Sequence, residues 1–464
     1  MLGTTFVLLT ILSLAHCIPL NQIQQARLIA NVSRTLFNQS QQHCICQMIS
    51  SLQSISALNY CSSNQTCQLF SSNLTLVDLD LDVGWMVIYT NQSLIANIFG
   101  SSITSTSTTT STSTSSTSTP YCPSMFRNQT GYATDANPQS AAIGDLNSDN
   151  KLDVVVANYG SNTISIFFNQ GNGIFSNQTT YTVGTHSTSI AVSDLDLDGE
   201  LDIVVANYNP PYISVLLNAG NGTFPNQTTY TTNSGPRSIT AVDMNFDTKP
   251  DLVVTNSLSN TVSIFLNAGN GSFYPRTDYT AGSHPYSGAV GDLNSDGTLD
   301  IITANFGNAT ISVLLNSGTN TFPTITLYST SINPFGIAVK DLNSDGKLDI
   351  VVANQGSNNV GVFLNQGNGT LLNQVTYTTG SKPQILALVD VNFDYMPDIA
   401  VSNQGASTVS VLLNAGNGTF LNQITYPTGQ NPYALAVGDL DSDSRPDIAT
   451  VSPGTNTLNI LLHC

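Results

Sequence analysis

The chain has 464 residues, with 29 acidic and 11 basic side chains and a formal net charge of −18 at pH 7. This length allows two or three domains. The negative charge argues against nucleic acids and anionic membrane surfaces as partners, because both attract basic patches.

The first 17 residues form a short apolar leader that ends in small residues. The leader is too short for a membrane span and predicts a signal peptide removed near Cys17, with an uncleaved anchor as the alternative. No later stretch is apolar for long enough to span a bilayer, so we expect a secreted, extracellular protein without membrane insertion. Removal of Cys17 leaves six cysteines, an even number typical of an oxidising compartment. Dense Asn-x-Ser/Thr sequons predict a glycosylated surface; they include Asn31, Asn64, Asn91, Asn177, Asn221, Asn308, Asn368 and Asn417.

Residues 18–100 form a separate small unit with four cysteines. Apolar residues at helical spacing between Ile45 and Leu52 predict an amphipathic helix. Two short apolar segments, 58–61 and 67–70, flank a polar turn. This arrangement resembles a PAN/apple module, an α+β fold in which helix cysteines are tied to a central hairpin. The resemblance implies Cys44–Cys67 and Cys46–Cys61 disulfides, and a generic two-disulfide head is the alternative.

Residues 101–121 are almost entirely serine and threonine up to Pro120. A segment of this composition cannot build a core. We expect an extended, O-glycosylated stalk, with an unmodified flexible linker as the alternative.

The rest of the chain is a repeat with a constant period. The string Asp-Leu-Asn-Ser-Asp, with close variants, begins at 145, 194, 243, 292, 341, 390 and 439, so every interval is 49 residues. Seven such copies fill residues 122–464. Each copy contains four short β-patterned segments, which in the second copy are 189–193, 201–206, 213–217 and 227–231. The pattern predicts an all-β, seven-bladed β-propeller of four-stranded antiparallel blades. A β-solenoid, whose coils are usually shorter, is the alternative.

The two ends of the repeat region indicate how the ring closes. In the repeat frame, Cys122 and Cys464 occupy adjacent positions of the turn between third and fourth strands. The chain therefore enters through a fourth strand and leaves through a third strand that complete one blade. We predict a Cys122–Cys464 disulfide at this point, which would constrain a very long loop.

A nine-residue acidic loop, Asp-x-Asp/Asn-x-Asp-Gly-x-Leu/Pro-Asp, follows the first strand of every copy. Acidic loops 1 to 7 are residues 145–153, 194–202, 243–251, 292–300, 341–349, 390–398 and 439–447. Calcium prefers six to eight hard oxygen ligands in flexible geometry. Side chains at positions 1, 3, 5 and 9 and the backbone carbonyl at position 7 would supply them, and glycine at position 6 would allow a positive φ. Asx-turns that bind no metal are the alternative.

The predicted calcium ligands are, loop by loop, Asp145, Asn147, Asp149, Lys151 and Asp153; Asp194, Asp196, Asp198, Glu200 and Asp202; Asp243, Asn245, Asp247 and Asp251; Asp292, Asn294, Asp296, Thr298 and Asp300; Asp341, Asn343, Asp345, Lys347 and Asp349; Asp390, Asn392, Asp394 and Asp398; and Asp439, Asp441, Asp443, Arg445 and Asp447. Acidic loops 2, 4, 5 and 7 are expected to bind best, on the basis of glycine at position 6 or four aspartates.

The second copy, from Asp194 through Asp202 and on to Asn-Gly-Thr-Phe224, resembles the FG-GAP/VCBS repeat. That repeat is similar to the blades of integrin α-subunit propellers. The resemblance implies calcium between first and second strands on one face, with partners on the other face or the rim. Thr248 and Tyr395 depart from the pattern because they replace the glycine of position 6.

Catalytic motifs with an activated nucleophile, a phosphate-binding loop or zinc-ligand spacing do not occur, and most carboxylates belong to the acidic loops. We therefore expect a monomeric binding protein for an extracellular glycan or protein, rather than an enzyme. A matrix or mucus component without a dedicated ligand is the alternative, and a secreted carbohydrate- or lipid-active enzyme is the third possibility.

Ligand recognition is expected at a variable position that begins each first strand, after a proline in six copies and after Ser187 in the second. The seven variable residues are Gln139, Thr188, Arg237, Tyr286, Phe335, Gln384 and Tyr433. Arg237, Tyr286, Phe335 and Tyr433 are the candidate ligand-binding residues, because arginine and aromatic side chains dominate recognition sites. Ordinary packing at a strand start is the alternative.

Overall fold

A computed structural model of the protein describes residues 125–127, 129–318 and 320–464, together with four short backbone strands nearer the N-terminus. These strands are β1 (Leu8–Thr10), β2 (Ala57–Cys61), β3 (Thr66–Phe70) and β4 (Trp85–Val87), and they pair as β1 with β4 and β2 with β3, both antiparallel. The chain divides into two compact units, Met1–Thr119 and Pro120–Cys464. Apart from these strands, the signal peptide, the helix within 18–100, the stalk and the Cys44–Cys67 and Cys46–Cys61 pairs lie outside the described residues.

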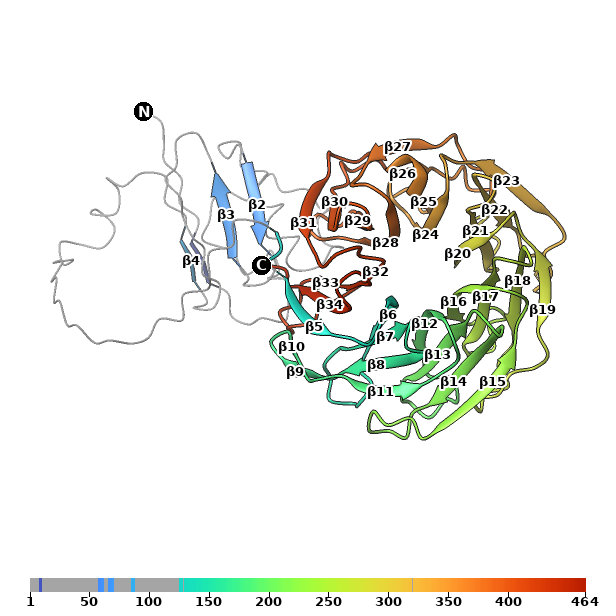
Figure 1. The fold of residues 1–464 in the computed structure, drawn as a ribbon. Helices are drawn as coiled ribbons and strands as arrows, with labels where there is room; N and C mark the ends of the chain where they lie inside the picture. The colour runs from blue at the N-terminus through green and yellow to red at the C-terminus, as the bar shows by residue number, and fades with distance from the viewer. Residues whose placement is uncertain are drawn as a thin grey trace, which may run out of the picture. The chain divides into compact units, whose positions relative to one another are not determined.

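The second unit is a ring of seven four-stranded antiparallel sheets, which confirms the predicted seven-bladed propeller (Figure 1). In the order from the axis to the rim, the blades are β6 (Pro138–Gly144), β7 (Asp153–Asn158), β8 (Thr163–Phe167) and β11 (Thr179–Thr182); β12 (Ser187–Ser193), β13 (Asp202–Asn207), β14 (Tyr212–Leu217) and β15 (Asn226–Thr231); β16 (Pro236–Val242), β17 (Asp251–Asn256), β18 (Thr261–Phe265) and β19 (Thr277–Thr280); β20 (Pro285–Gly291), β21 (Asp300–Asn305), β22 (Thr310–Leu314) and β23 (Ile325–Ser329); β24 (Pro334–Lys340), β25 (Asp349–Asn354), β26 (Asn359–Phe363) and β27 (Val375–Thr378); β28 (Pro383–Val389), β29 (Asp398–Asn403), β30 (Thr408–Leu412) and β31 (Ile424–Pro427); and β32 (Ala434–Gly438), β33 (Asp447–Ser452), β34 (Thr457–Leu461) and β5 (Thr130–Ala133).

Two smaller elements complete the described part of the ring. A hairpin of β9 (Asn169–Gly171) and β10 (Ile174–Phe175) forms the turn between the third and fourth strands of the first blade. A single 3₁₀ turn, η5 (Gln355–Ser357), connects β25 to β26. Within the described ranges, no helix is long and apolar enough to cross a membrane.

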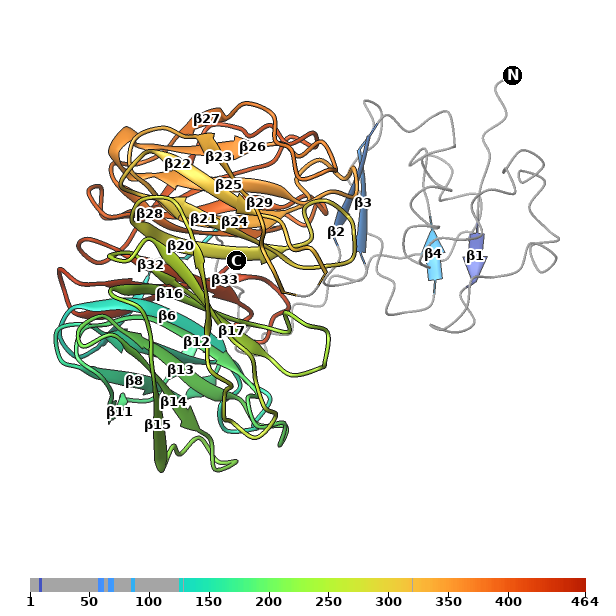
Figure 2. The same cartoon turned by 90° about the vertical axis from the view of Figure 1, so that its right-hand side faces the viewer.

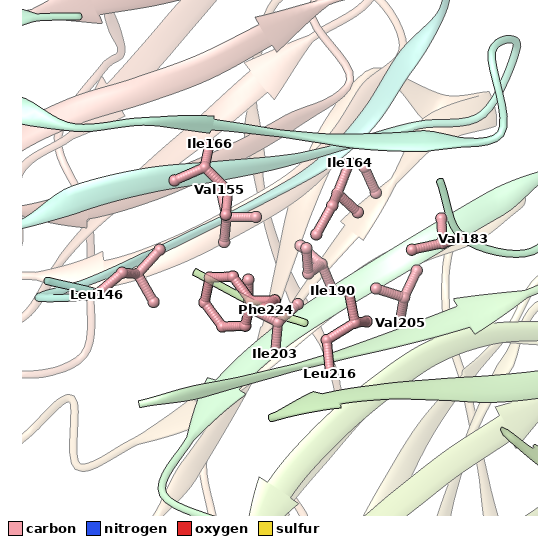
Figure 3. Packing of buried hydrophobic residues seen from close by; sticks show 11 residues of the cluster. Leu146, Val155, Ile164, Ile166, Val183, Ile190, Ile203, Val205, Leu216 and Phe224 are labelled. Carbon is pink, nitrogen blue, oxygen red and sulfur yellow. The ribbon is translucent and has the colours of Figure 1, made fainter. Parts of the chain in front are cut away.

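The hydrophobic cores lie between neighbouring blades, because each sheet is covered on both faces. The second strand of every blade is buried at all six positions, and its successive side chains point to opposite neighbours. Val155 and Ala157 of β7 pack against the second blade, whereas Val154 and Val156 pack against the seventh. Figure 3 shows the first of these cores, in which Val155 and Ile164 meet Ile203, Val205 and Leu216. This double burial explains why second strands are continuous β-branched runs rather than alternating patterns.

The ring closes as the sequence predicts, through strands from both ends of the propeller. Strand β5 is the fourth strand of the last blade and pairs antiparallel with β34. Phe126 bridges His463, and the Cys464 N–H donates to the Met125 carbonyl at 3.0 Å. Cys464 forms a disulfide whose partner lies outside the described residues. The Cys122–Cys464 pairing therefore stays a prediction.

Candidate metal loops and the opposite face

All seven acidic loops lie on one face of the ring. Each acidic loop connects the first strand of a blade to the second, and in an antiparallel sheet the turn between third and fourth strands returns to the same end. We call this the loop face. The opposite side, where first strands begin and second strands end, is called the entry face. Figure 2 shows the ring turned by 90°.

Each acidic loop folds around its own carboxylates, which accept hydrogen bonds from backbone N–H groups of the same loop. In loop 2, Asp194 accepts the N–H groups of Asp198 and Gly199 at 3.1 and 3.0 Å, and Asp198 accepts that of Glu200 at 2.9 Å. The same pattern requires a positive φ at position 6 in every loop, with values of 62° at Asn150, 93° at Gly199, 70° at Thr248, 84° at Gly297, 81° at Gly346, 68° at Tyr395 and 68° at Ser444. The sequence prediction of a left-handed residue at position 6 is confirmed, and Thr248 and Tyr395 carry the strain that glycine avoids.

The aspartate at position 9 joins the loop to the rest of its blade. The side chain of Asp202 is fully buried and accepts the Leu195 N–H and the Asn218 N–H, both at 2.8 Å. Loss of solvation raises the pKa of the equivalent carboxyls, to about 6 for Asp153, Asp202, Asp251, Asp300 and Asp398 and to about 7 for Asp447, and it also raises the pKa of Asp349. Each buried carboxylate is therefore costly without a nearby cation.

Acidic loops 2 and 7 differ from the other five because position 3 is aspartate. Carboxylate oxygens of Asp194, Asp196 and Asp202 lie within 4.8 Å of one another, as do those of the matching residues Asp439, Asp441 and Asp447. One oxygen of each position-3 residue, Asp196 Oδ1 and Asp441 Oδ1, is buried without a hydrogen-bond partner.

The electrostatics of position 3 follow from this crowding. Burial and the neighbouring Asp198 carboxylate raise the pKa of Asp196, and burial and Asp443 do the same for Asp441. In the other loops an asparagine takes this place, and Asn147 Oδ1, for example, accepts the Asp149 N–H at 3.2 Å. Loops 2 and 7 therefore present an unsatisfied carboxylate cluster that the other loops lack.

The residue at position 7 also distinguishes the loops, because it determines whether the aspartate of position 5 has a basic partner. A basic side chain at this position pairs with the aspartate of position 5 in four loops: Lys151 with Asp149 at 2.8 Å, Lys249 with Asp247 at 3.3 Å, Lys347 with Asp345 at 3.4 Å, and Arg445 with Asp443 at 3.8 Å. Loop 2 instead has Glu200, which accepts a hydrogen bond from the Ser148 hydroxyl of loop 1. Loop 2 is thus the only acidic loop with five carboxylates, and no basic side chain of the described residues pairs with it.

A second set of side chains, which the sequence reasoning missed, connects six of the seven blades to the acidic loop of the preceding blade. Asn218 Nδ2 donates to the Leu146 carbonyl of loop 1 at 2.8 Å and to the Leu201 carbonyl of its own loop at 3.0 Å. Asn267, Asn365, Asn414 and Asn169 repeat the bond to Leu195, Leu293, Leu342 and Leu440. In the last blade His463 replaces asparagine, with Nε2 2.9 Å from the Val391 carbonyl, so this nitrogen is the donor. Asn316 bonds within its own blade instead. The available signal was the recurrence of asparagine every 49 residues.

On the entry face, the four candidate ligand-binding residues come from four blades and meet in one cluster. Arg237 Cζ lies 4.5 Å from the centroid of the Tyr286 ring, and Nη1 lies 3.4 Å from the Tyr433 hydroxyl. Phe335 makes edge contacts with both tyrosines, at centroid distances of 5.2 and 5.5 Å. Only Phe335 of the four is buried, at 6% exposure, so part of the predicted surface is packing.

The other three variable residues do not join this cluster through a contact among the described residues. Thr188 is buried and donates to the Pro236 carbonyl, Gln384 is fully buried beside Gln404, and Gln139 is partly exposed. Two aromatic residues that follow second strands were not predicted but belong to the cluster. Tyr208 lies 5.2 Å from Arg237 Cζ, and Phe306 stacks on Tyr286 at 4.4 Å.

Comparison with known proteins gives a family. The family described as FG-GAP-like repeat matches residues 145–205, 194–254, 243–303, 292–352, 341–401 and 390–450, which together span most of the propeller. The chain belongs to this family. The resemblance predicted from the second copy is confirmed.

Solved structures with the same fold share little sequence with these FG-GAP-like repeats. Virginiamycin B lyase from Staphylococcus aureus has 16% identity and a TM-score of 0.53 over 73% of this chain and 100% of that one. BBS1N, solved in complex with ARL6DN, has 14% identity and a TM-score of 0.53 over 74% of this chain and 98% of that one. These likenesses show the propeller fold alone. Comparison with curated proteins found no match.

Each FG-GAP-like span begins at position 1 of one acidic loop and ends shortly after the next. The acidic loops therefore belong to what the copies share with the family. The variable entry-face residues from Thr188 to Tyr433 also lie within the matched spans, but they differ from copy to copy.

Proposed function

We propose that this FG-GAP-like propeller is a secreted, calcium-binding module that binds an extracellular glycan or protein. The observation that carries the calcium proposal is the pair of buried, unpaired carboxylate oxygens, Asp196 Oδ1 and Asp441 Oδ1. Buried charged groups without partners are rare in folded proteins, because each costs several kcal/mol unless a counter-charge is present. Three carboxylates within 4.8 Å form a donor set of the hard oxygen type that calcium prefers.

Acidic loop 2 is proposed as the strongest site. Asp194, Asp196, Asp198 and Asp202 would hold the ion, and a bound cation would satisfy the free oxygen and offset the repulsion among the four charges. Loop 7 has the same four aspartates, but Arg445 near Asp443 competes for one of them. Loops 4 and 5 keep the glycine of position 6 but have asparagine at position 3, so they should bind more weakly than the sequence alone suggested.

The calcium ion would act as a structural cation in this protein. The loop that holds it is connected through asparagine side chains to the neighbouring blade, as Asn218 connects loops 1 and 2. A calcium ion that orders one acidic loop would therefore also help to order the neighbouring loop bonded to the same asparagine. A ligand that binds only the folded state raises stability in proportion to the logarithm of its concentration above Kd.

Ligand binding rather than catalysis is proposed for the entry face. Of the described acidic side chains, only Asp135 and Asp278 lie outside the acidic loops, and both are held by hydrogen bonds within the blades. The entry face otherwise presents aromatic, amide and guanidinium groups, which are recognition groups, together with the imidazoles of His186 and His284, whose ring nitrogens have no carboxylate among their hydrogen-bond partners in the described residues. The predicted signal peptide and the sequons support an extracellular location.

The calcium proposal is tested by calorimetric titration of metal-free, full-length protein. Wild-type protein should bind calcium at two sites at least, in the 10⁻⁴–10⁻³ M range or tighter, and magnesium more weakly. D196N and D441N, which install the asparagine found in the other loops, should each weaken one site about tenfold. N147D is the reverse control: it gives loop 1 the aspartate of loops 2 and 7 and should raise the calcium affinity of loop 1. Absence of calcium heat, together with a melting temperature that calcium does not change, would refute the proposal.

A further inference from the structure

Arg237 is a cation without an acidic partner. No carboxylate of the described residues lies within 4.0 Å of its guanidinium, whereas Lys151, Lys249, Arg276, Lys347 and Arg445 each have one; Arg127, Lys340 and Lys382 also lack one. The Nε atom of Arg237 is buried and has no hydrogen-bond partner. In a chain with a net charge of −18, the partly buried cation on the entry face has therefore been left without an internal anion.

The aromatic surroundings of Arg237 hold the guanidinium in place but do not satisfy it. Tyr286 and Tyr208 lie 4.5 and 5.2 Å from Cζ, within the range of cation–π attraction. That attraction acts over a ring face, whereas the N–H groups radiate in the guanidinium plane. The contact to the Tyr433 hydroxyl is long, at 3.4 Å. Arg237 and Tyr286 are partly exposed, whereas Tyr433 lies deeper, where burial raises the pKa of its hydroxyl.

Unpaired amide groups occur at the same strand position in other blades. Gln139 Oε1 and Gln384 Oε1 are buried without hydrogen-bond partners, and Gln384 as a whole is 0% exposed. Both residues are the second residue of a first strand, as Arg237 is, and therefore belong to the same ring of positions. Unsatisfied buried polar groups of this kind are rare in native proteins, and a bound polar group is one way to satisfy them. Two observations, the guanidinium without an anion and the unpaired Oε1 of the partly exposed Gln139, thus point to a polar ligand, whereas the fully buried Gln384 lies out of its reach.

We propose that Arg237, with Tyr208, Tyr286 and Tyr433 around it, is the subsite for the carboxylate of an acidic sugar. The proposal rests on the entry face being the ligand-binding face. A guanidinium matches a carboxylate through two parallel N–H donors. The partly exposed Gln139 occupies the equivalent position of the first blade, and its amide can both donate to and accept from hydroxyl groups. The partly exposed tyrosines beside Arg237 add apolar ring edges and hydroxyl groups. A hexuronic acid presents all three complementary features in one residue.

The test uses full-length, calcium-saturated protein and two sugars that differ in one group, D-glucuronate and D-glucose, with binding followed by ligand-observed NMR. Glucuronate should bind at least tenfold more tightly than glucose. R237Q should weaken glucuronate binding about ten- to 100-fold, the loss expected for a charge-assisted pair, and R237K should keep part of it. The matched control is R276Q, which removes an arginine bonded to Asp278 at 3.0 Å and should bind glucuronate normally.

Further readouts separate the possible failures. R237Q should keep the calcium titration of wild-type protein, so loss of sugar binding with calcium binding intact supports the subsite and not a general failure to fold. Equal binding of glucose and glucuronate, no binding of either sugar at millimolar concentration, or normal glucuronate binding by R237Q would overturn it. Binding of N-acetyl-aspartyl peptides in preference to glucuronate, lost in R237Q, would also overturn it by assigning the arginine to an acidic peptide. None of these results bears on the carboxylate clusters of loops 2 and 7.

Discussion

Replacement of Asn414 by alanine tests whether side-chain bonds between blades stabilise the ring. Asn414 Nδ2 donates to the Leu342 carbonyl of the preceding blade at 2.8 Å and to the Pro397 carbonyl at 3.1 Å, and Oδ1 accepts the Gly416 N–H at 3.0 Å. The side chain is 4% exposed, so water does not replace the lost partners freely. Asn316 is an internal control, because its bonds go to Leu299, Asn320 and Gly318 of its own blade.

The difference between the two variants isolates the bond between blades. N316A and N414A each lose a bond to a neighbouring carbonyl and a bond from a turn glycine, whereas N414A alone leaves the Leu342 carbonyl without its asparagine donor. A buried polar group left unpaired costs about 1–3 kcal/mol. We therefore expect N414A to reduce the free energy of unfolding by about 2–4 kcal/mol, and N316A by about 1–2 kcal/mol.

Urea unfolding in saturating calcium measures both variants, with melting temperatures as a second readout. For a ring of this size each kcal/mol shifts the melting temperature by about 1–2 °C, so denaturant midpoints are the more sensitive measure. Equal losses in N414A and N316A would refute the reasoning, because the bond between blades would then contribute nothing beyond the turn. A change in the slope of the urea transition would show that blades unfold separately.

Three other predictions follow from the loops and the closure. Y395G should raise the free energy of unfolding by about 1 kcal/mol, because Tyr395 has a φ of 68° and is 77% exposed, and G346T should lower it by a similar amount; melting temperatures check both. Metal-free protein should become more stable as the pH falls from 7 to 5, because burial holds the folded-state pKa of aspartates such as Asp202 at about 6, above the unfolded value of 3.8, so the folded state binds more protons in that window. Calcium should reverse this trend, because it requires ionised carboxylates; melting at both pH values, with and without calcium, tests the sign. Peptide mapping of unreduced protein should link Cys464 to Cys122, and a peptide that links Cys464 to Cys44, Cys46, Cys61 or Cys67 would contradict the closure.

The ring itself could be predicted from the sequence because its information is local and repeated. The 49-residue period fixed the number of blades, and the β-branched segment at 201–206 anticipated β13 (Asp202–Asn207) within one residue. The offset between Cys122 and Cys464 was enough to predict that β5 completes the last blade. These conclusions needed only the spacing of the repeat and the pattern of apolar residues, both of which can be read without knowledge of tertiary contacts.

The bonds between blades and the entry-face cluster could not be predicted in the same way. Asn218 and its equivalents lie just before an Asn-Gly turn, so a role in that turn was enough to explain why asparagine occurs there. Their bonds to the preceding blade join residues 72 positions apart, as Asn218 and Leu146 are, and a local pattern does not reveal such a contact. The variable residues were expected to line a channel mouth, but spacing gives no side-chain direction. Phe335 turned inward between Tyr286 and Tyr433. Side-chain length and rotamer decide which aromatic rings come into contact, and the 49-residue period of the sequence predicts neither of them.

Comparison of the seven copies distinguishes the positions at which the propeller fold requires one type of residue from the positions at which it accepts several. Leucine, methionine or valine occupies position 2 of every acidic loop and is almost fully buried in each, and position 9 is aspartate in all seven, so packing and backbone bonding dictate both. Position 3 is aspartate in loops 2 and 7 and asparagine in the other five, and the variable residue at the start of the first strand differs as widely as Thr188 and Arg237 in blades of the same architecture. Since the fold accepts all of these, closure of the ring does not explain the free carboxylate of Asp196 or the unpaired guanidinium of Arg237. Their opposite charges lie on opposite faces, which is the arrangement expected if one face binds a cation and the other an anion.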